Sequence, residues 1–140
     1  MTRLTDHFTL EEMCATKHKD IDNTLPMCYY DNMLEICEIL ERLRRALGGK
    51  PIKINSGYRC RELNRAVGGS EKSLHLTGEA VDIACENLDD ACRKMAKLAR
   101  LCADFDELYI EGSLRTERVW LHFGYKNVGL GLGRCGFIAK

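Results

Sequence analysis

The sequence predicts an α+β protein in which helices flank a small, mainly antiparallel sheet. Three observations predict this fold: helical periodicity occurs in two separate stretches, strand-like alternation occurs in others, and the last third of the chain contains strand-like segments alone. No linker, repeat or low-complexity stretch divides the 140 residues, a number typical of one domain. We therefore expect residues 1–140 to form a single domain.

The first long helix is expected at residues 31–47, where apolar side chains recur every three or four positions. Asp31 is its expected N-cap, and Gly48-Gly49 follows the last turn as a stop signal. The residues on its apolar face are Met33, Ile36, Cys37, Leu40, Leu43 and Leu47.

Shorter elements follow this helix. Residues 51–58 alternate apolar and polar side chains up to a Ser-Gly pair, which predicts a strand and a turn. A short helix at about 60–67 ends at Gly68-Gly69, and the apolar stretch 80–85 predicts a second strand.

A second amphipathic helix is expected at about 88–103. Asn87 can cap it, and Asp90 completes a box-like pattern. The side chains expected to point inward are Ala91, Cys92, Met95, Leu98, Ala99 and Cys102.

The remaining elements are strands. Residues 107–111 and 119–125 suit a hairpin, and a weaker strand is expected near the C-terminus. Alternation within 119–125 places Leu121, Phe123 and Tyr125 on one face and Trp120, His122 and Gly124 on the other.

Composition excludes several classes of protein. Because 21 basic residues balance 21 acidic ones, the charge excess of a nucleic-acid-binding protein is missing. No apolar run approaches the roughly 20 residues that span a bilayer, and the N-terminus lacks the apolar segment of a secretory signal. We expect a monomer that is synthesised in the cytoplasm and has no nucleic-acid or membrane partner.

Two further sequence features suggest structural roles. Gly129, Gly131 and Gly133 lack the strand-to-helix context of a phosphate loop, so we interpret them as a turn or strand edge. The eight cysteines form no CxxC or CxxH pair, and we expect most to be reduced packing residues. The alternatives are partial disulfide formation after release from the cell and a cysteine nucleophile, although nothing in the sequence places a base beside one.

Two of the four histidines suggest a metal site. His7 and His18 lie in the polar N-terminal segment and are expected to be exposed. His75 lies in a loop that a glycine can turn towards Asp82 on the following strand, and His122 points away from the packed face of its own strand. Two imidazoles and one carboxylate would leave a tetrahedral position for water, as catalytic zinc requires. The alternative is that these residues never meet.

The sequence resembles the M15 family of zinc D,D-peptidases, especially its M15A branch of D-alanyl-D-alanine carboxypeptidases and phage or prophage lysins. The segments that carry the resemblance are FTLEEM, IDNTLP, SGYRC with LNRAVGG, SLHLTGEAVDI, FDELYIE and WLH. The SxHxxGxAxD pattern is matched by Ser73, His75, Gly78, Ala80 and Asp82. The resemblance spans nearly the whole chain and implies a fold related to the hedgehog signalling domain.

The resemblance also implies a ligand set, in which His75, Asp82 and His122 bind one Zn²⁺ ion. The resemblance assigns the general base less directly than the metal ligands. Several relatives place an acid three positions before the last histidine, where this chain has Val119.

The hedgehog domain instead has a glutamate at the end of a similar strand, and Glu111 matches that position. A hairpin would let Glu111 face the His122 strand, where it could accept the proton of a zinc-bound water. Glu117 and Asp106 are the alternative bases.

Three more residues complete the predicted site. Arg59 suits a substrate carboxylate or a developing oxyanion, with an ion pair to a nearby acid as the alternative. Ser73 is expected either to bind substrate or to cap its loop. Trp120 is expected either to line the substrate groove or to pack.

The expected function is hydrolysis of peptidoglycan stem or cross-link peptides, at a bond that involves D-alanine. The alternatives are an L-alanyl-D-glutamate endopeptidase and a non-catalytic zinc-containing binding module of the hedgehog type. For an enzyme without a signal peptide, we expect the wall to be reached through a holin or lysis, as in a phage endolysin.

Overall fold

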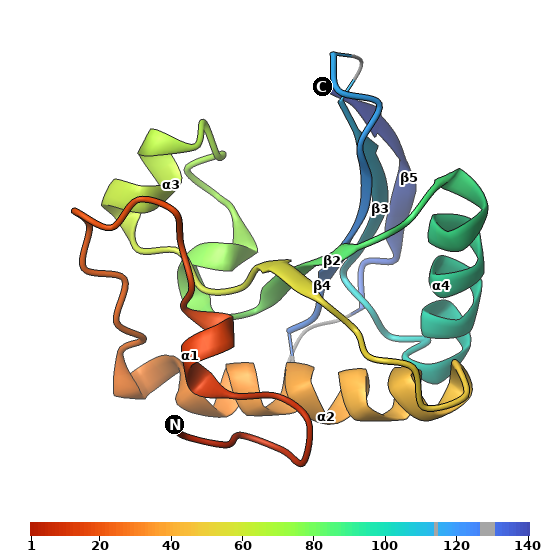
Figure 1. Cartoon of the computed structure of the whole chain (residues 1–140), viewed down its shortest axis with the longest axis horizontal. Coiled ribbons are helices and arrows are strands. Elements are labelled where there is room, and N and C mark those ends of the chain that lie inside the picture. The colour runs from red at the N-terminus through yellow and green to blue at the C-terminus, as the bar shows by residue number, and fades with distance from the viewer. Residues whose placement is uncertain (114, 127–130) are drawn as a thin grey trace.

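The computed structural model describes residues 1–113, 115–126 and 131–140. Figure 1 shows the helices and strands in their order along the chain. They are α1 (Leu10–Met13), the 3-10 helix η1 (Met27–Tyr29), α2 (Tyr30–Ala46), β1 (Ile54–Ser56), α3 (Arg61–Ala66), the 3-10 helix η2 (Leu74–Thr77), β2 (Ala80–Ala84), α4 (Leu88–Leu101), β3 (Glu107–Gly112), β4 (Val119–Gly124) and β5 (Arg134–Ala139).

The strands form one sheet in the order β1-β2-β4-β3-β5. The pairs β1–β2, β2–β4 and β3–β4 are antiparallel, whereas β5 runs parallel to β3. The prediction of an α+β fold with a mainly antiparallel sheet is therefore confirmed. The parallel pair was not predicted, because a weak strand signal does not identify the neighbour of that strand.

The two faces of the sheet differ, because one packs against helices and the other carries polar side chains. One face is covered by α2 and α4 and contributes Val81, Ile83, Leu108, Ile110, Leu121 and Phe123, all at most 3% exposed. The alternation predicted for 119–125 is thus observed in β4. The opposite face carries Asp82, Glu111 and His122.

Two details of the helices differ from the prediction. Helix α2 begins at Tyr30 directly after η1, so Asp31 lies in its first turn and does not cap it. Cys92 is exposed, because the buried stripe of α4 runs through Ala91 and Leu98 and a neighbouring position points about 100° away. The predicted cap is confirmed, since the Asn87 side chain accepts a hydrogen bond from the Asp90 amide at 2.8 Å.

The glycines near the C-terminus are only partly described. Gly131 and Gly133 have φ angles of 62° and 64°, which favour glycine in a turn, and Gly129 lies outside the described residues. Within the described chain, no helix has both the length and the apolar character needed to cross a bilayer.

Candidate metal centre and active site

Three side chains converge on the polar face of the sheet. Asp82 of β2 and His122 of β4 are register partners, and His75 reaches them from η2. Asp82 Oδ1 lies 3.0 Å from His122 Nδ1 and 3.3 Å from His75 Nε2. Ligands about 2.0–2.1 Å from a tetrahedral zinc ion are about 3.3 Å apart. One ligand atom from each residue lies within 4.8 Å of the other two, so the trio could hold one metal ion, and all three residues are buried.

Local sequence explains how His75 reaches the site. The Ser73 hydroxyl accepts a hydrogen bond from the His75 amide and starts η2, and Gly78 ends it in the left-handed region at φ 70°. His75 Nδ1 lies 2.6 Å from the Gly57 carbonyl oxygen, to which it can only donate. In a neutral imidazole this bond would leave the lone pair of Nε2, which lies beside Asp82, for a metal ion.

Glu107 orients the imidazole of His122, as the Gly57 carbonyl orients that of His75. Its Oε1 lies 2.8 Å from His122 Nε2, an arrangement in which the carboxylate accepts a hydrogen bond and leaves Nδ1 for a metal. The hydrogen bond from His122 lowers the pKa of Glu107. Burial disfavours the imidazolium, but hydrogen bonds to Asp82 and Glu107 outweigh it and raise the pKa of His122 to about 9. Sequence reasoning missed Glu107.

Substitution of Glu107 with Ala is expected to weaken zinc binding by about 10- to 100-fold, because His122 loses its orienting acceptor. Competition with a chromophoric chelator measures the affinity, and Glu38→Ala, on the exposed side of α2, is the matched control. Unchanged affinity in Glu107→Ala would mean that this hydrogen bond has no effect on the metal centre.

Glu111 lies on the same face, two positions further along β3 than the register partner of His122. Its side chain is mostly buried, and its Oε1 accepts a 2.7 Å hydrogen bond from the indole N–H of Trp120. Lys140 Nζ lies 3.5 Å from the same oxygen. Glu111, His75 and His122 all line one cavity of about 180 Å³, so a carboxylate faces the candidate metal centre.

The two alternative acids lie elsewhere. Asp106 is 2% exposed, and its Oδ2 accepts a 2.7 Å hydrogen bond from the Lys126 amide. Glu117 is exposed in the connection between β3 and β4, with φ 55°. Neither of them lines the cavity that Glu111 shares with the two histidines.

Arg59 also lines this cavity. Its guanidinium donates to Ser56 Oγ at 3.2 Å and to Asn64 Oδ1 at 3.0 Å, and it lies 3.8 Å from Asp82 Oδ2. Burial lowers the pKa of Arg59, although the charge of Asp82 opposes that effect. The guanidinium is therefore held in place by neutral partners, and its ion pair with Asp82 is long.

The N-terminal segment holds the loop that carries Arg59. The buried Asn23 amide donates to the Tyr58 carbonyl at 2.8 Å and to the Cys14 carbonyl at 3.0 Å, and its oxygen accepts from the Cys60 amide at 2.8 Å. A single side chain thus bonds to the backbone on both sides of Arg59. Sequence reasoning used IDNTLP only as part of the family resemblance and did not assign Asn23 a role.

Ser73 and Trp120 differ in their relation to the cavity. Ser73 lines it as well as capping η2, so both of its expected roles remain open to it. Trp120 is not among the lining residues, and its polar contact is the hydrogen bond to Glu111.

Comparison with known proteins yields two matches. The chain matches the family model described as Peptidase M15 over residues 6–123. It is also similar to the zinc D-Ala-D-Ala carboxypeptidase of Streptomyces albus G, with 43% identity over 44 residues, or 31% of this chain. The matched part spans 17% of the length of that relative. Because the family model covers most of the chain, including every residue of the candidate metal centre, the chain belongs to the peptidase M15 family.

Proposed function

We propose that this protein is a zinc-dependent peptidase that hydrolyses peptidoglycan peptides at a bond involving D-alanine. One observation carries the proposal: Asp82 Oδ1 lies 3.0 Å from His122 Nδ1 and 3.3 Å from His75 Nε2, and both histidines line a cavity with the buried carboxylate of Glu111. The family and a relative named as a zinc D-Ala-D-Ala carboxypeptidase support it.

In this proposal His75, Asp82 and His122 hold the ion. Zinc bound there would supply a Lewis acid for the scissile carbonyl and bring the pKa of a water molecule near 7. Glu111 accepts the proton that this water loses during attack and can return it to the leaving amine.

Arg59 binds the terminal carboxylate of the substrate or the developing oxyanion. A guanidinium suits both because its N–H donors form a planar fork. The hydrogen bonds to Ser56 and Asn64 orient this fork before substrate arrives, and the distance to Asp82 leaves it able to take another anion. Ser73, on the same cavity wall, offers a hydroxyl to the substrate backbone.

Trp120 serves as a positioning residue for Glu111. The Trp120→Phe substitution keeps the apolar ring and removes the donor, so it is expected to lower kcat about tenfold, the scale of one hydrogen bond to a charged group. KM should change less than twofold. Steady-state kinetics on a peptide ending in D-Ala-D-Ala give both constants, and a change confined to KM would instead assign Trp120 to substrate binding.

Metal dependence tests the proposed function itself. Purified protein with zinc should release D-alanine or cut the cross-link of muropeptides, chelator should abolish the cleavage, and added zinc should restore it. Mass spectrometry of the products identifies the bond. Cleavage between L-alanine and D-glutamate would establish the alternative endopeptidase, and stoichiometric zinc binding without cleavage would establish the binding module.

The proposal extends to a lysin of phage or prophage type that reaches the wall after a holin or lysis event and acts as a monomer. Its support is the resemblance of the segments around the site to that branch of the family. The expected result is lysis of permeabilised cells by added protein, with intact cells unaffected.

A further inference from the structure

Two larger cavities continue from the candidate metal centre along the 70–74 segment. A cavity of about 400 Å³ shares Ser73 and Glu107 with the cavity that contains the histidines. A third cavity, of about 610 Å³, shares Lys72, Ser73 and Lys126 with the second. The three are therefore contiguous, and Ser73 lines all of them.

The middle cavity is lined by three exposed cations: Lys72, Lys126 and Arg134. None of their side chains forms an ion pair with another residue among those described. The acids in the same lining already have partners. Glu107 bonds to His122, and Asp106 accepts from the backbone amide of Lys126. The middle cavity is thus lined by three cations and two carboxylates, and because Glu107 is already paired with His122, a net positive charge faces a ligand.

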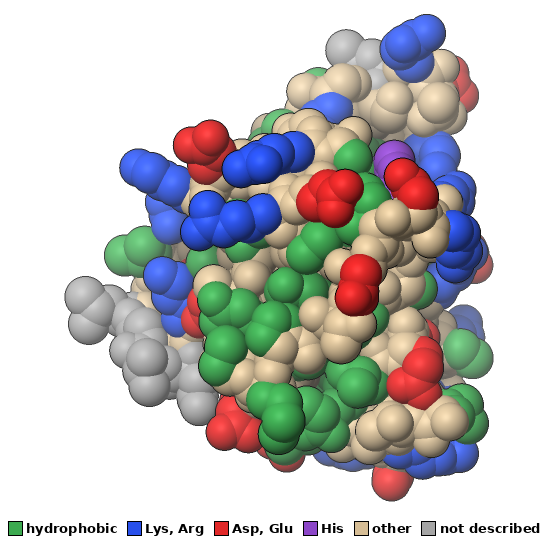
Figure 2. Space-filling view, turned by 90° about the vertical axis from the view of Figure 1, so that its left-hand side faces the viewer, with side chains coloured by type: hydrophobic (Ala, Val, Ile, Leu, Met, Phe, Trp, Pro, Cys, Tyr) green, Lys and Arg blue, Asp and Glu red, His purple; other side chains and the backbone are tan. Residues whose placement is uncertain are grey.

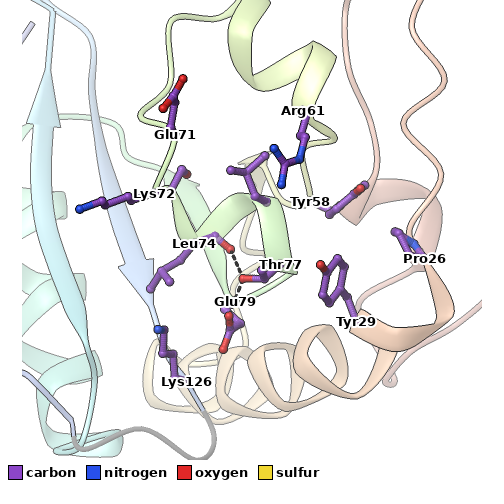
Figure 3. A pocket seen from close by; sticks show the side chains of 12 residues that line it. Pro26, Tyr29, Tyr58, Arg61, Glu71, Lys72, Leu74, Thr77, Glu79 and Lys126 are labelled. Atoms are coloured by element: carbon purple, nitrogen blue, oxygen red, sulfur yellow. Dashed lines mark hydrogen bonds between the residues drawn. The ribbon is translucent and has the colours of Figure 1, made fainter.

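Beyond the two lysines, the third cavity is lined by a third cation, Arg61, by two acids, Glu71 and Glu79, and by aromatic rings. Figure 3 shows Lys72 and Lys126 on the side of this cavity nearest the sheet and Tyr29 and Tyr58 on the far side. The two tyrosine rings have centroids 6.4 Å apart. On the face seen in Figure 2, Lys and Arg side chains gather at the level of α3, beside an apolar area. A ligand that leaves the metal centre by this route meets cations first and aromatic rings second.

We propose that the two outer cavities bind the acyl side of the substrate and select stem peptides that carry free carboxylates, with Lys72, Lys126 and Arg134 as the selecting cations. This inference rests on the proposed function. If Arg59 takes the terminal carboxylate, the rest of the stem leaves the metal centre elsewhere, and the contiguous cavities provide a path. A stem linked through the side chain of D-glutamate keeps a free α-carboxylate, which matches this path in charge.

The size of the effect follows from the exposure of the cations. Ion pairs at exposed sites are weak individually and are screened by salt, so a preference of roughly three- to tenfold is expected between charged and neutral ligands. At about 1 M salt, charges are screened beyond about 3 Å, so the charged and neutral ligands should bind with nearly equal affinity.

Two synthetic stem pentapeptides provide the test, one with the free α-carboxylate on D-glutamate and one with a carboxamide there. Their dissociation constants are measured by calorimetry on the zinc-loaded Glu111→Gln variant, which holds peptide without turnover. We expect the carboxylate form to bind three- to tenfold more tightly. Adding Lys72→Met, Lys126→Met and Arg134→Met should bring the ratio to about one, whereas Lys50→Met, an exposed site outside these cavities, should leave it unchanged.

Equal binding of the two peptides, or a preference that survives the three substitutions, overturns the inference. Cleavage of the carboxamide peptide by the unmodified zinc enzyme separates this failure from that of the proposed function, because such cleavage needs the metal centre and not the cations. Absence of binding by either peptide would overturn both. Near-identical circular dichroism spectra of the variants would confirm that they fold alike.

Discussion

Replacing Glu111 with Gln is expected to lower kcat for peptide hydrolysis by about 10²- to 10⁴-fold, the range that general-base catalysis contributes. Glutamine has the same shape, and its carbonyl oxygen can still accept the Trp120 hydrogen bond, so the site should keep its geometry. Glu111 is not one of the three converging ligand residues, and zinc content should therefore stay near one ion per chain. Single-turnover kinetics and metal analysis on the same sample measure both quantities.

Glu117→Gln is the matched control, because Glu117 is an exposed acid in the connection that follows β3. It should retain nearly full activity. If Glu111→Gln remains active while Glu117→Gln does not, the base has been assigned to the wrong glutamate. Loss of zinc along with activity in Glu111→Gln would instead indicate a fourth ligand and leave the base unassigned.

Among the single substitutions considered, replacement of Asp82 is expected to weaken metal binding most. This carboxylate contacts both imidazoles and lies 3.8 Å from the Arg59 guanidinium. Burial disfavours its charged form, yet the charge of His75 and the hydrogen bonds from both histidines keep the pKa of Asp82 far below its usual range. Asp82 is thus held in its anionic form, which can bind a cation.

Asp82→Ala should weaken zinc binding on the order of 10²- to 10³-fold, since one of three ligands and its charge are lost. In the unmodified protein, zinc should raise the thermal midpoint of unfolding in proportion to its binding free energy, and in the variant this increase should disappear at the same zinc concentration. Asp89→Ala, on the exposed first turn of α4, is the control. A zinc-dependent increase that persists in Asp82→Ala would place the ion at a different site.

Much of the site could be predicted from local sequence. Alternation in 119–125 indicates which face His122 takes, and a glycine after His75 allows the loop to return towards Asp82. The three residues converge in space only because β2 pairs with β4. In the sequence, these two strands are separated by the whole of α4 and β3. Periodicity does not specify such long-range pairing, so the family resemblance was needed to predict it.

Sequence analysis missed the roles of Glu107 and Asn23. Each of these residues acts through a contact with a residue that is distant in the sequence. Glu107 is 15 positions from His122, and Asn23 is 35 positions from Tyr58. In the sequence, Glu107 resembles an ordinary acid at the start of a strand. The spacing of Glu107 and Glu111 by four residues does place both on one face of β3, and that alternation was the available signal.

The errors in the helices have a local cause. A 3-10 turn placed before α2 moves its first residue to Tyr30, and apolar periodicity cannot register such a turn. Cys92 adjoins Ala91 in the sequence, but α4 contacts β3 and β4 along a narrower stripe than its apolar residues would allow. The width of a buried stripe depends on the neighbouring elements, which the helix sequence does not contain.

The two-faced sheet also determines where the chain can change length. One residue inserted into β4 before His122 would exchange the faces of all following side chains, so that the imidazole would enter the core and a phenylalanine or leucine would enter the cavity. The same insertion in the connection between β3 and β4 would leave both strands in register. Relatives should therefore vary in the length of this connection and keep the spacing within each strand unchanged.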